Sequence, residues 1–138
     1  MQTIEIKNEE ELLAIIIPFE FKKEGIDFFT PNDYSQQLAY MNHPANHKIQ
    51  PHKHNKVSRE VHYTLETIFV RKGKVKVDFY SNNEKYICSY EIKTGDVILL
   101  VSGGHGFTML EQTEMIEVKQ GPYAGENDKI RFKGIENE

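Results

Sequence analysis

Cysteine, tryptophan and long hydrophobic runs are scarce in this 138-residue chain, which has one cysteine, Cys88, and no tryptophan. A single cysteine excludes an intrachain disulfide framework and suits a reducing compartment. The apolar run LLAIII near the N-terminus falls far short of the roughly 20 residues of a spanning helix, and its flanks lack the order of regions of a signal peptide. The sequence therefore predicts a soluble, cytoplasmic protein.

Neither sign of charge is in large excess. The formal net charge is -4, and the Lys, Arg, Asp and Glu residues are interspersed along the chain. No basic stripe is present of the kind that nucleic-acid binders use. The composition favours a small-molecule substrate, with neither a nucleic acid nor a membrane as partner.

Long helical periodicity is also missing. Turn signals such as RKGK, SNNEK and KTGD recur at short intervals, and the runs between them are rich in Ile, Val, Phe and Tyr. This pattern is typical of an all-β sandwich or barrel, and the length suits one domain. Only the stretch PNDYSQQLAYM is ambiguous, because it fits a short helix or another strand equally well.

Three consecutive segments predict a meander: ETIFVRKG, KVKVDFY and YICSYEI, joined by turns at Gly73 and at Asn82-Asn83. KVKVDFY alternates apolar and polar residues, so it predicts a strand with one buried face. The continuous apolar run VILLV predicts a strand that is covered on both faces. TEMIEVKQ predicts one more strand, in which Glu117 and Lys119 share a face opposite an apolar one.

Four side chains are candidates for one metal site. His52 and His54 in PHKH would leave the same face of a strand. Glu66 opens an apolar strand, where an inward carboxylate is costly unless it is paired or bound to a metal. His105 lies between glycines in SGGHGF, which lets the backbone bend sharply there. Imidazole and carboxylate together suit a divalent transition metal, namely Fe, Mn, Ni, Co or Zn.

The order of these motifs resembles the cupins, small jelly-roll β-barrels. Their first motif is His-x-His, then Glu, then six residues and Gly, and Glu66 to Gly73 has that spacing. Their second motif begins with Gly and ends with His, which Gly95 and His105 match, although Val101 stands where many cupins have proline and the histidine comes one residue early. The resemblance implies metal ligation by His52, His54, Glu66 and His105.

The C-terminal stretch EVKQGPYAGENDKIRF is similar to a narrower group, the cupin metalloproteins of WbuC type encoded among bacterial surface-polysaccharide genes. The resemblance covers residues 49–132. It implies one cupin-like domain over residues 1–138, with residues 1–48 as N-terminal extension strands and 49–132 as the barrel core. We expect the extension to pair with a neighbour's sheet edge in a homodimer.

A second register is possible for the first motif. Eleven residues separate His54 from Glu66, more than the cupin pattern has. Glu60 and His62 also stand two apart, and His62 precedes Glu66 by the usual three residues. The site would then consist of Glu60, His62, Glu66 and His105, a set with more carboxylates. The roles of Arg59, Lys76 and Glu117 stay open.

The resemblance implies a metal-dependent enzyme acting on a small polar substrate, such as a sugar or a sugar-nucleotide, by isomerisation or epimerisation. Glu66 and Tyr123 are the candidate catalytic residues for the proton transfers. The same ligand set permits an Fe(II) dioxygenase or a non-catalytic binding protein. A metal-free epimerase would need a histidine-aspartate base pair, which the sequence does not locate.

Overall fold

The structure, a computed structural model, describes residues 1–135 and is all-β, as the sequence predicts. Its helical part within that range is one short 3-10 helix, and none of its helices is long and apolar enough to span a membrane. In chain order the elements are β1 (Ile4–Asn8), β2 (Glu11–Ile17), β3 (Gly25–Phe28), β4 (Ala39–Asn42), β5 (Glu66–Lys72), β6 (Lys74–Tyr80), β7 (Tyr86–Lys93), β8 (Val97–Leu100), β9 (Gly104–Met109), β10 (Glu114–Lys119) and η1 (Gly125–Asp128).

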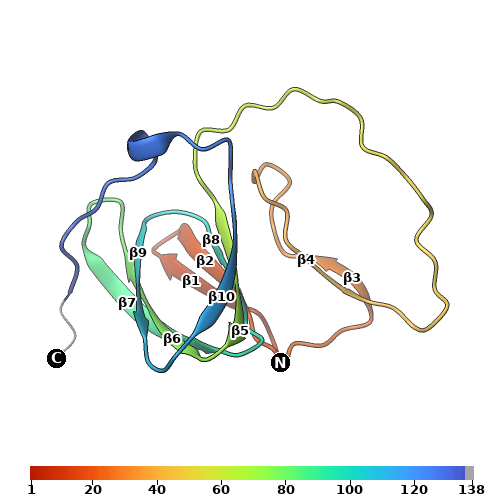
Figure 1. Ribbon diagram of the computed structural model, residues 1–138, viewed down its shortest axis with the longest axis horizontal. Coiled ribbons are helices and arrows are strands. Elements are labelled where there is room, and N and C mark those ends of the chain that lie inside the picture. Colours follow the sequence, from red (N-terminus) through yellow and green to blue (C-terminus); the bar gives the residue numbers. More distant parts are fainter. Residues whose placement is uncertain (136–138) are drawn as a thin grey trace.

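The strands form three antiparallel sheets. A five-stranded sheet has the order β1-β2-β8-β5-β10, a three-stranded sheet has the order β7-β6-β9, and β3 and β4 form a separate hairpin. None of these sheets closes on itself within the described residues. Figure 1 shows the two larger sheets facing each other. The main core lies between them and takes buried side chains from β1, β2, β5, β6, β7 and β8.

β8 has the predicted burial, and β6 has it in part. In β6, Val75, Val77 and Phe79 are buried against the facing sheet, but Asp78 and Tyr80 on the other face, predicted to be wet, are buried as well. In β8, Ile98 packs in the main core, whereas Leu99 packs in a second cluster on the other face of its sheet. That second cluster includes residues of the segment between β3 and β4, which therefore covers the outer face of β8.

The predicted meander is wrong at its first turn. β5 pairs with β8 and β10, while β6 pairs with β7 and β9, so Gly73 carries the chain from one sheet to the other. Gly73 has φ +114°, and a Cβ there would lie 2.5 Å from Thr113 Oγ1 and 2.6 Å from the backbone oxygen of Gln112. Only glycine tolerates that backbone conformation and that close approach. The second turn is as predicted, because β6 and β7 form a hairpin.

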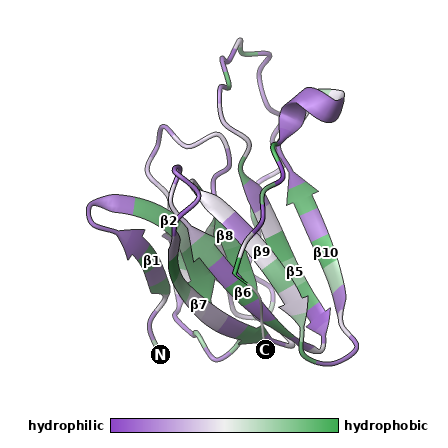
Figure 2. Ribbon diagram, turned by 90° about the vertical axis from the view of Figure 1, so that its left-hand side faces the viewer, coloured by the Kyte–Doolittle hydropathy of each residue, from purple (hydrophilic) through white to green (hydrophobic). Residues whose placement is uncertain are grey.

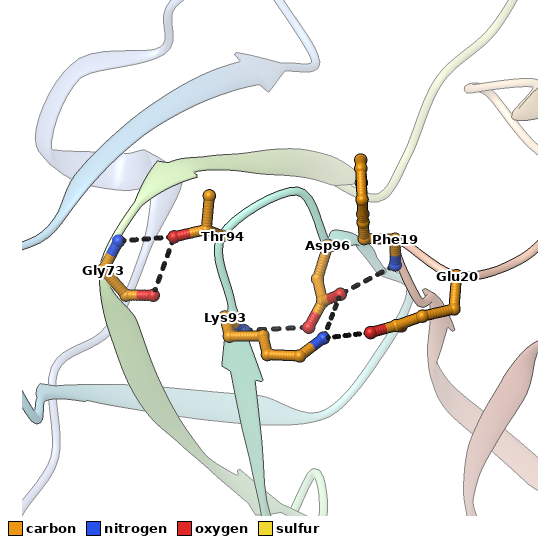
Figure 3. A network of polar contacts seen from close by, with 6 residues as sticks. All are labelled: Phe19, Glu20, Gly73, Lys93, Thr94 and Asp96. Carbon is orange, nitrogen blue, oxygen red and sulfur yellow. Dashed lines mark hydrogen bonds and ion pairs between the residues drawn. The ribbon is translucent and has the colours of Figure 1, made fainter.

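A buried carboxylate ties the turn between β7 and β8 to the end of β2 (Figure 3). Asp96 accepts hydrogen bonds from the backbone N–H of Phe19 and of Lys93, each at 2.8 Å. Lys93 Nζ lies 3.6 Å from the same carboxylate and donates to Glu20 at 2.9 Å. Backbone donors of this kind satisfy a charge that would be costly to bury alone. The network holds β2 beside β8, inside the sheet that carries β5.

The N-terminal segment differs from the prediction. β1 and β2 pair with each other, and β2 pairs with β8 of the same chain rather than with a neighbour's edge. The structure describes one chain, so the homodimer stays a prediction. The ambiguous stretch PNDYSQQLAYM forms turns that lead into β4 and not a helix. Between β4 and β5, residues 43–65 form no strand and run as a wide arc outside the facing sheets (Figure 1).

We predict that Gly73→Ala destabilises the fold by about 2–4 kcal/mol, because it combines backbone strain with a steric clash. Denaturant unfolding followed by circular dichroism would measure the loss. Gly106→Ala is the matched control, since a Cβ at Gly106 in β9 meets no heavy atom within 4 Å. Equal free energies of unfolding for the two variants would contradict this account of the turn.

Candidate functional site

In strand β10, charged residues lie on the face toward the facing sheet and apolar residues on the outer face, the reverse of an ordinary amphipathic strand. Glu117 pairs in register with Ile68 and Lys119 with Glu66, so both point to the face on which Ile68 is buried. Ile116 and Val118 point outward and are 47% and 51% exposed. Figure 2 shows this alternation of hydrophilic and hydrophobic residues along the strand. Glu117 is itself solvent-exposed and Lys119 is partly buried, so this end of the inner face is polar and open to solvent rather than part of the core.

The centre of the site is a carboxylate-imidazole pair between the two sheets. Glu66 Oε2 lies 3.6 Å from His105 Nε2, and both side chains are partly buried. Glu66 begins β5 in the five-stranded sheet. His105 lies on β9 opposite Phe79, a core residue of the three-stranded sheet, so its ring points toward the five-stranded sheet. The structure thus brings these two predicted site residues together, while their assignment as metal ligands stays a prediction.

A second carboxyl group completes an acid-base arrangement. The hydrogen bond from His105 lowers the pKa of Glu66 below its ordinary value, and a hydrogen bond with Glu117 lowers it further, while burial acts in the opposite direction. The pKa of Glu117 is raised, mainly because its carboxyl group bonds to the Glu66 carboxylate. Glu66 therefore loses its proton before Glu117, and when the pair holds a single proton, that proton resides mainly on Glu117.

Lys119 supplies the positive charge at this end of the sheets. Its Nζ lies 3.0 Å from Asp128 Oδ2, and the hydrogen bond that it donates to Asp128 raises the pKa of Lys119. Asp128 ends η1, and its Oδ1 accepts a hydrogen bond from Thr64 Oγ1 at 3.4 Å. The ring centroid of Tyr123 lies 5.8 Å from Lys119 Nζ, although Tyr123 itself is 78% exposed. Tyr123, a candidate catalytic residue, thus lies next to the site, with its ring beside Lys119.

The four predicted metal ligands do not all come together. His52 and His54 lie in the exposed arc, where their rings contact each other and His52 Nδ1 bonds to the Gln50 carbonyl oxygen. The second register is not assembled either: His62 and Glu60 are 3.7 Å apart, and both are highly exposed. Within residues 1–135, no three His, Cys, Asp or Glu side chains are grouped as a metal ion requires. The structure therefore brings together two of the four predicted ligands, Glu66 and His105.

A cavity of about 640 Å³ lies on the side of the arc, and Glu66, His105 and Glu117 are not among its lining residues. Thr64, which contacts Asp128, is one of its lining residues. Its walls combine apolar residues such as Tyr34 and Val101 with polar residues such as Asn82 and Glu11. Leu65 and Tyr34, which line the cavity, pack in the second cluster on the outer face of the sheet, whereas Glu66 points to the inner face.

Comparison of the chain with protein-family models, with curated proteins and with solved structures gives no match. The chemistry of the site must therefore be argued from its own residues.

The sequence does not single out three residues of the site: it leaves the role of Glu117 open, it places Lys119 only on a face of the strand, and it predicts no role for Asp128. The available signal was the alternation in EMIEVK, where two charged residues share one face of a strand. The sequence alone could not tell which face was inside. Asp128 had no local signal, because it reaches Lys119 from a separate segment.

We predict that the pKa of Glu117 lies above the ordinary glutamate value of about 4.3, and that Glu66→Gln returns the Glu117 pKa toward that value because the charged acceptor is gone. Carbon-detected NMR of the side-chain carboxyl groups would measure both pKa values. Glu20, whose pKa is lowered by Lys93, is the internal control and should titrate identically in both proteins. A Glu117 pKa at or below the ordinary value in the unmodified protein would refute the shared proton.

Proposed function

We propose that this protein is an enzyme that moves protons on a small polar substrate at the Glu66, His105 and Glu117 site. The observation that carries the proposal is the 3.6 Å contact of Glu66 with His105 beside a second carboxyl group, Glu117, with the pKa of Glu66 lowered and that of Glu117 raised. Two titratable groups whose pKa values are pushed apart can act as base and acid of one reaction. Glu66 and His105 lie partly buried between the sheets, where such groups act on a bound molecule.

The division of roles follows from the charges. Glu66 is the base that removes a proton from a carbon next to a carbonyl group. Glu117 is the acid that gives its proton to the carbonyl oxygen as the electron pair moves there. His105 is a positioning residue that keeps the Glu66 carboxylate ionised and oriented. Returning the proton to a different atom or face would complete an isomerisation or an epimerisation.

The fold and substrate class complete the proposal. Two facing antiparallel sheets with a polar site between them are compatible with a cupin jelly roll. The resemblance to WbuC-type cupins supports a sugar or a sugar-nucleotide as substrate, by analogy and not from the site. The carboxylate-imidazole pair takes the place of the histidine-aspartate pair that a metal-free epimerase needs. An Fe(II) dioxygenase would instead consume oxygen, which an oxygen electrode would detect.

We predict that the protein catalyses exchange of carbon-bound hydrogen for deuterium in a panel of sugars and sugar-nucleotides dissolved in D₂O, measured by proton NMR. Glu66→Gln should lower the exchange rate by about 10²–10⁴-fold, because it removes the base. Glu117→Gln should lower it as well, because the carbonyl oxygen loses its acid.

Glu114→Gln is the matched control, since Glu114 lies at the far end of β10 and is exposed. It should exchange hydrogen at the rate of the unmodified protein. Circular dichroism and thermal unfolding would establish that each variant is folded. Undiminished exchange in folded Glu66→Gln would contradict the role of Glu66.

A divalent transition metal is the second candidate for this site, and one observation favours it. Glu66 Oε2 and His105 Nε2 present two ligand atoms to the same space, 3.6 Å apart. Bound there, the ion would polarise a substrate oxygen. His52 and His54 lie in an arc without strand pairing, so completing the site requires that arc to fold toward the sheets. We propose the metal-dependent activity as a second candidate that requires this movement of the arc.

We predict for this candidate that protein purified without added metal contains Fe, Mn, Ni, Co or Zn by elemental analysis, and that His105→Ala loses it because one of the two assembled donors is gone. Comparing His52→Ala with His62→Ala would then separate the two registers, with loss expected in the former. Metal retained at the original level in His105→Ala would rule out a metal at this pair.

A further inference from the structure

We propose that Lys119 and Thr64 form a binding seat for a carboxylate group, which Asp128 fills in the free protein and the substrate's carboxylate takes on binding. This inference rests on the proposed function, because it places the substrate relative to Glu66. It adds a substrate class: small molecules in which a carboxylate stands near the carbon that loses its proton.

The first step concerns the position of Lys119. Lys119 pairs directly with Glu66 across β5 and β10, so its side chain starts on the same face as the base. Its Nζ nevertheless bonds at 3.0 Å to Asp128, a residue of another segment. The Lys119 and Asp128 side chains are 25% and 12% exposed. A partly buried ammonium therefore binds a carboxylate immediately beside the proton-transfer pair.

The second step concerns what holds Asp128 there. None of the four residues of η1 is buried, and the helix has no side-chain N-cap hydrogen bond. The Asp128 carboxylate contacts Lys119 at one oxygen and Thr64 at the other. The chain beyond η1 is anchored, because Phe132 packs edge-on against Tyr80 with ring centroids 5.1 Å apart. A ligand can therefore displace the carboxylate by a local movement of η1.

The third step is the charge of the ligand. The seat offers one ammonium and one hydroxyl donor, which match the two oxygens of a carboxylate. Glu66 is ionised close by and contributes to the raised pKa of Lys119 through its negative charge. A dianion such as phosphate would bring one more negative charge toward Glu66 than a carboxylate does. The site therefore favours a singly charged carboxylate over phosphate.

The experiment is an NMR titration of the whole protein with glycolate and, separately, with inorganic phosphate, following backbone amide signals around Lys119 and Thr64. Asp128→Asn should bind glycolate about tenfold more tightly than the unmodified protein, because the internal competitor is gone. Lys119→Met should abolish binding, and Thr64→Val should weaken it severalfold while leaving the ammonium in place. Glu126→Gln, an exposed change in the same helix, is the matched control and should bind as the unmodified protein does.

Unchanged or weaker glycolate binding in Asp128→Asn would overturn the proposal, as would tighter binding of phosphate than of glycolate. Glu66→Gln separates this proposal from the proposed function, because it should keep or strengthen glycolate binding while losing deuterium exchange. If glycolate binds as expected and no panel compound exchanges, the seat stands and the proton-transfer function fails. If exchange occurs and Asp128→Asn leaves glycolate affinity unchanged, the proton-transfer function stands and the carboxylate seat fails.

Discussion

The ionised carboxylate of Glu66, held between two sheets, is the constraint on which the rest of the site depends. A carboxylate in that position is stable only with partners, and these come from two other strands: His105 from β9, and Glu117 and Lys119 from β10. Satisfying one buried charge thus places an imidazole, a carboxyl group and an ammonium around it. The polar end of the sandwich is a network built around that charge, while the apolar core begins at Ile68, two residues along the same strand.

The pair of carboxyl groups also explains why the site can carry chemistry rather than only stability. Two ionised carboxylates in contact repel each other, so the charge of Glu66 raises the pKa of Glu117. His105 determines which of the two loses its proton first, because it bonds to Glu66. The electrostatic asymmetry of the pair is therefore set by the facing sheet. A substitution of His105 on β9 would therefore alter the pKa of Glu117 on β10 through Glu66.

The sequence predicted those features that depend on local pattern. Alternation identified β6, the apolar run identified β8, and the inward direction of Glu66 and His105 followed from a strand start and a glycine-flanked bend. Strand pairing was not predictable in the same way: Gly73 signals a turn, but a turn does not say whether the next strand pairs back or joins the facing sheet. The role of Glu117 depends on the register of β10 with β5, a long-range property. His52 and His54 could share a face only in a strand, and the polar residues around them provide no apolar alternation to hold one.

The switch of sheets at Gly73 has a consequence for folding. β5 carries the base, yet its two neighbours, β8 and β10, come from 25 or more residues later in the chain. Contacts this far apart in sequence close slowly, because the chain loses loop entropy before it gains the pairing. The hairpin of β6 and β7 is local and can form early, whereas Glu66 meets Lys119 only after the chain has been synthesised through β10. The charged end of the facing sheets therefore depends on the slow, long-range part of folding, as does the part of the core that β5 and β8 share.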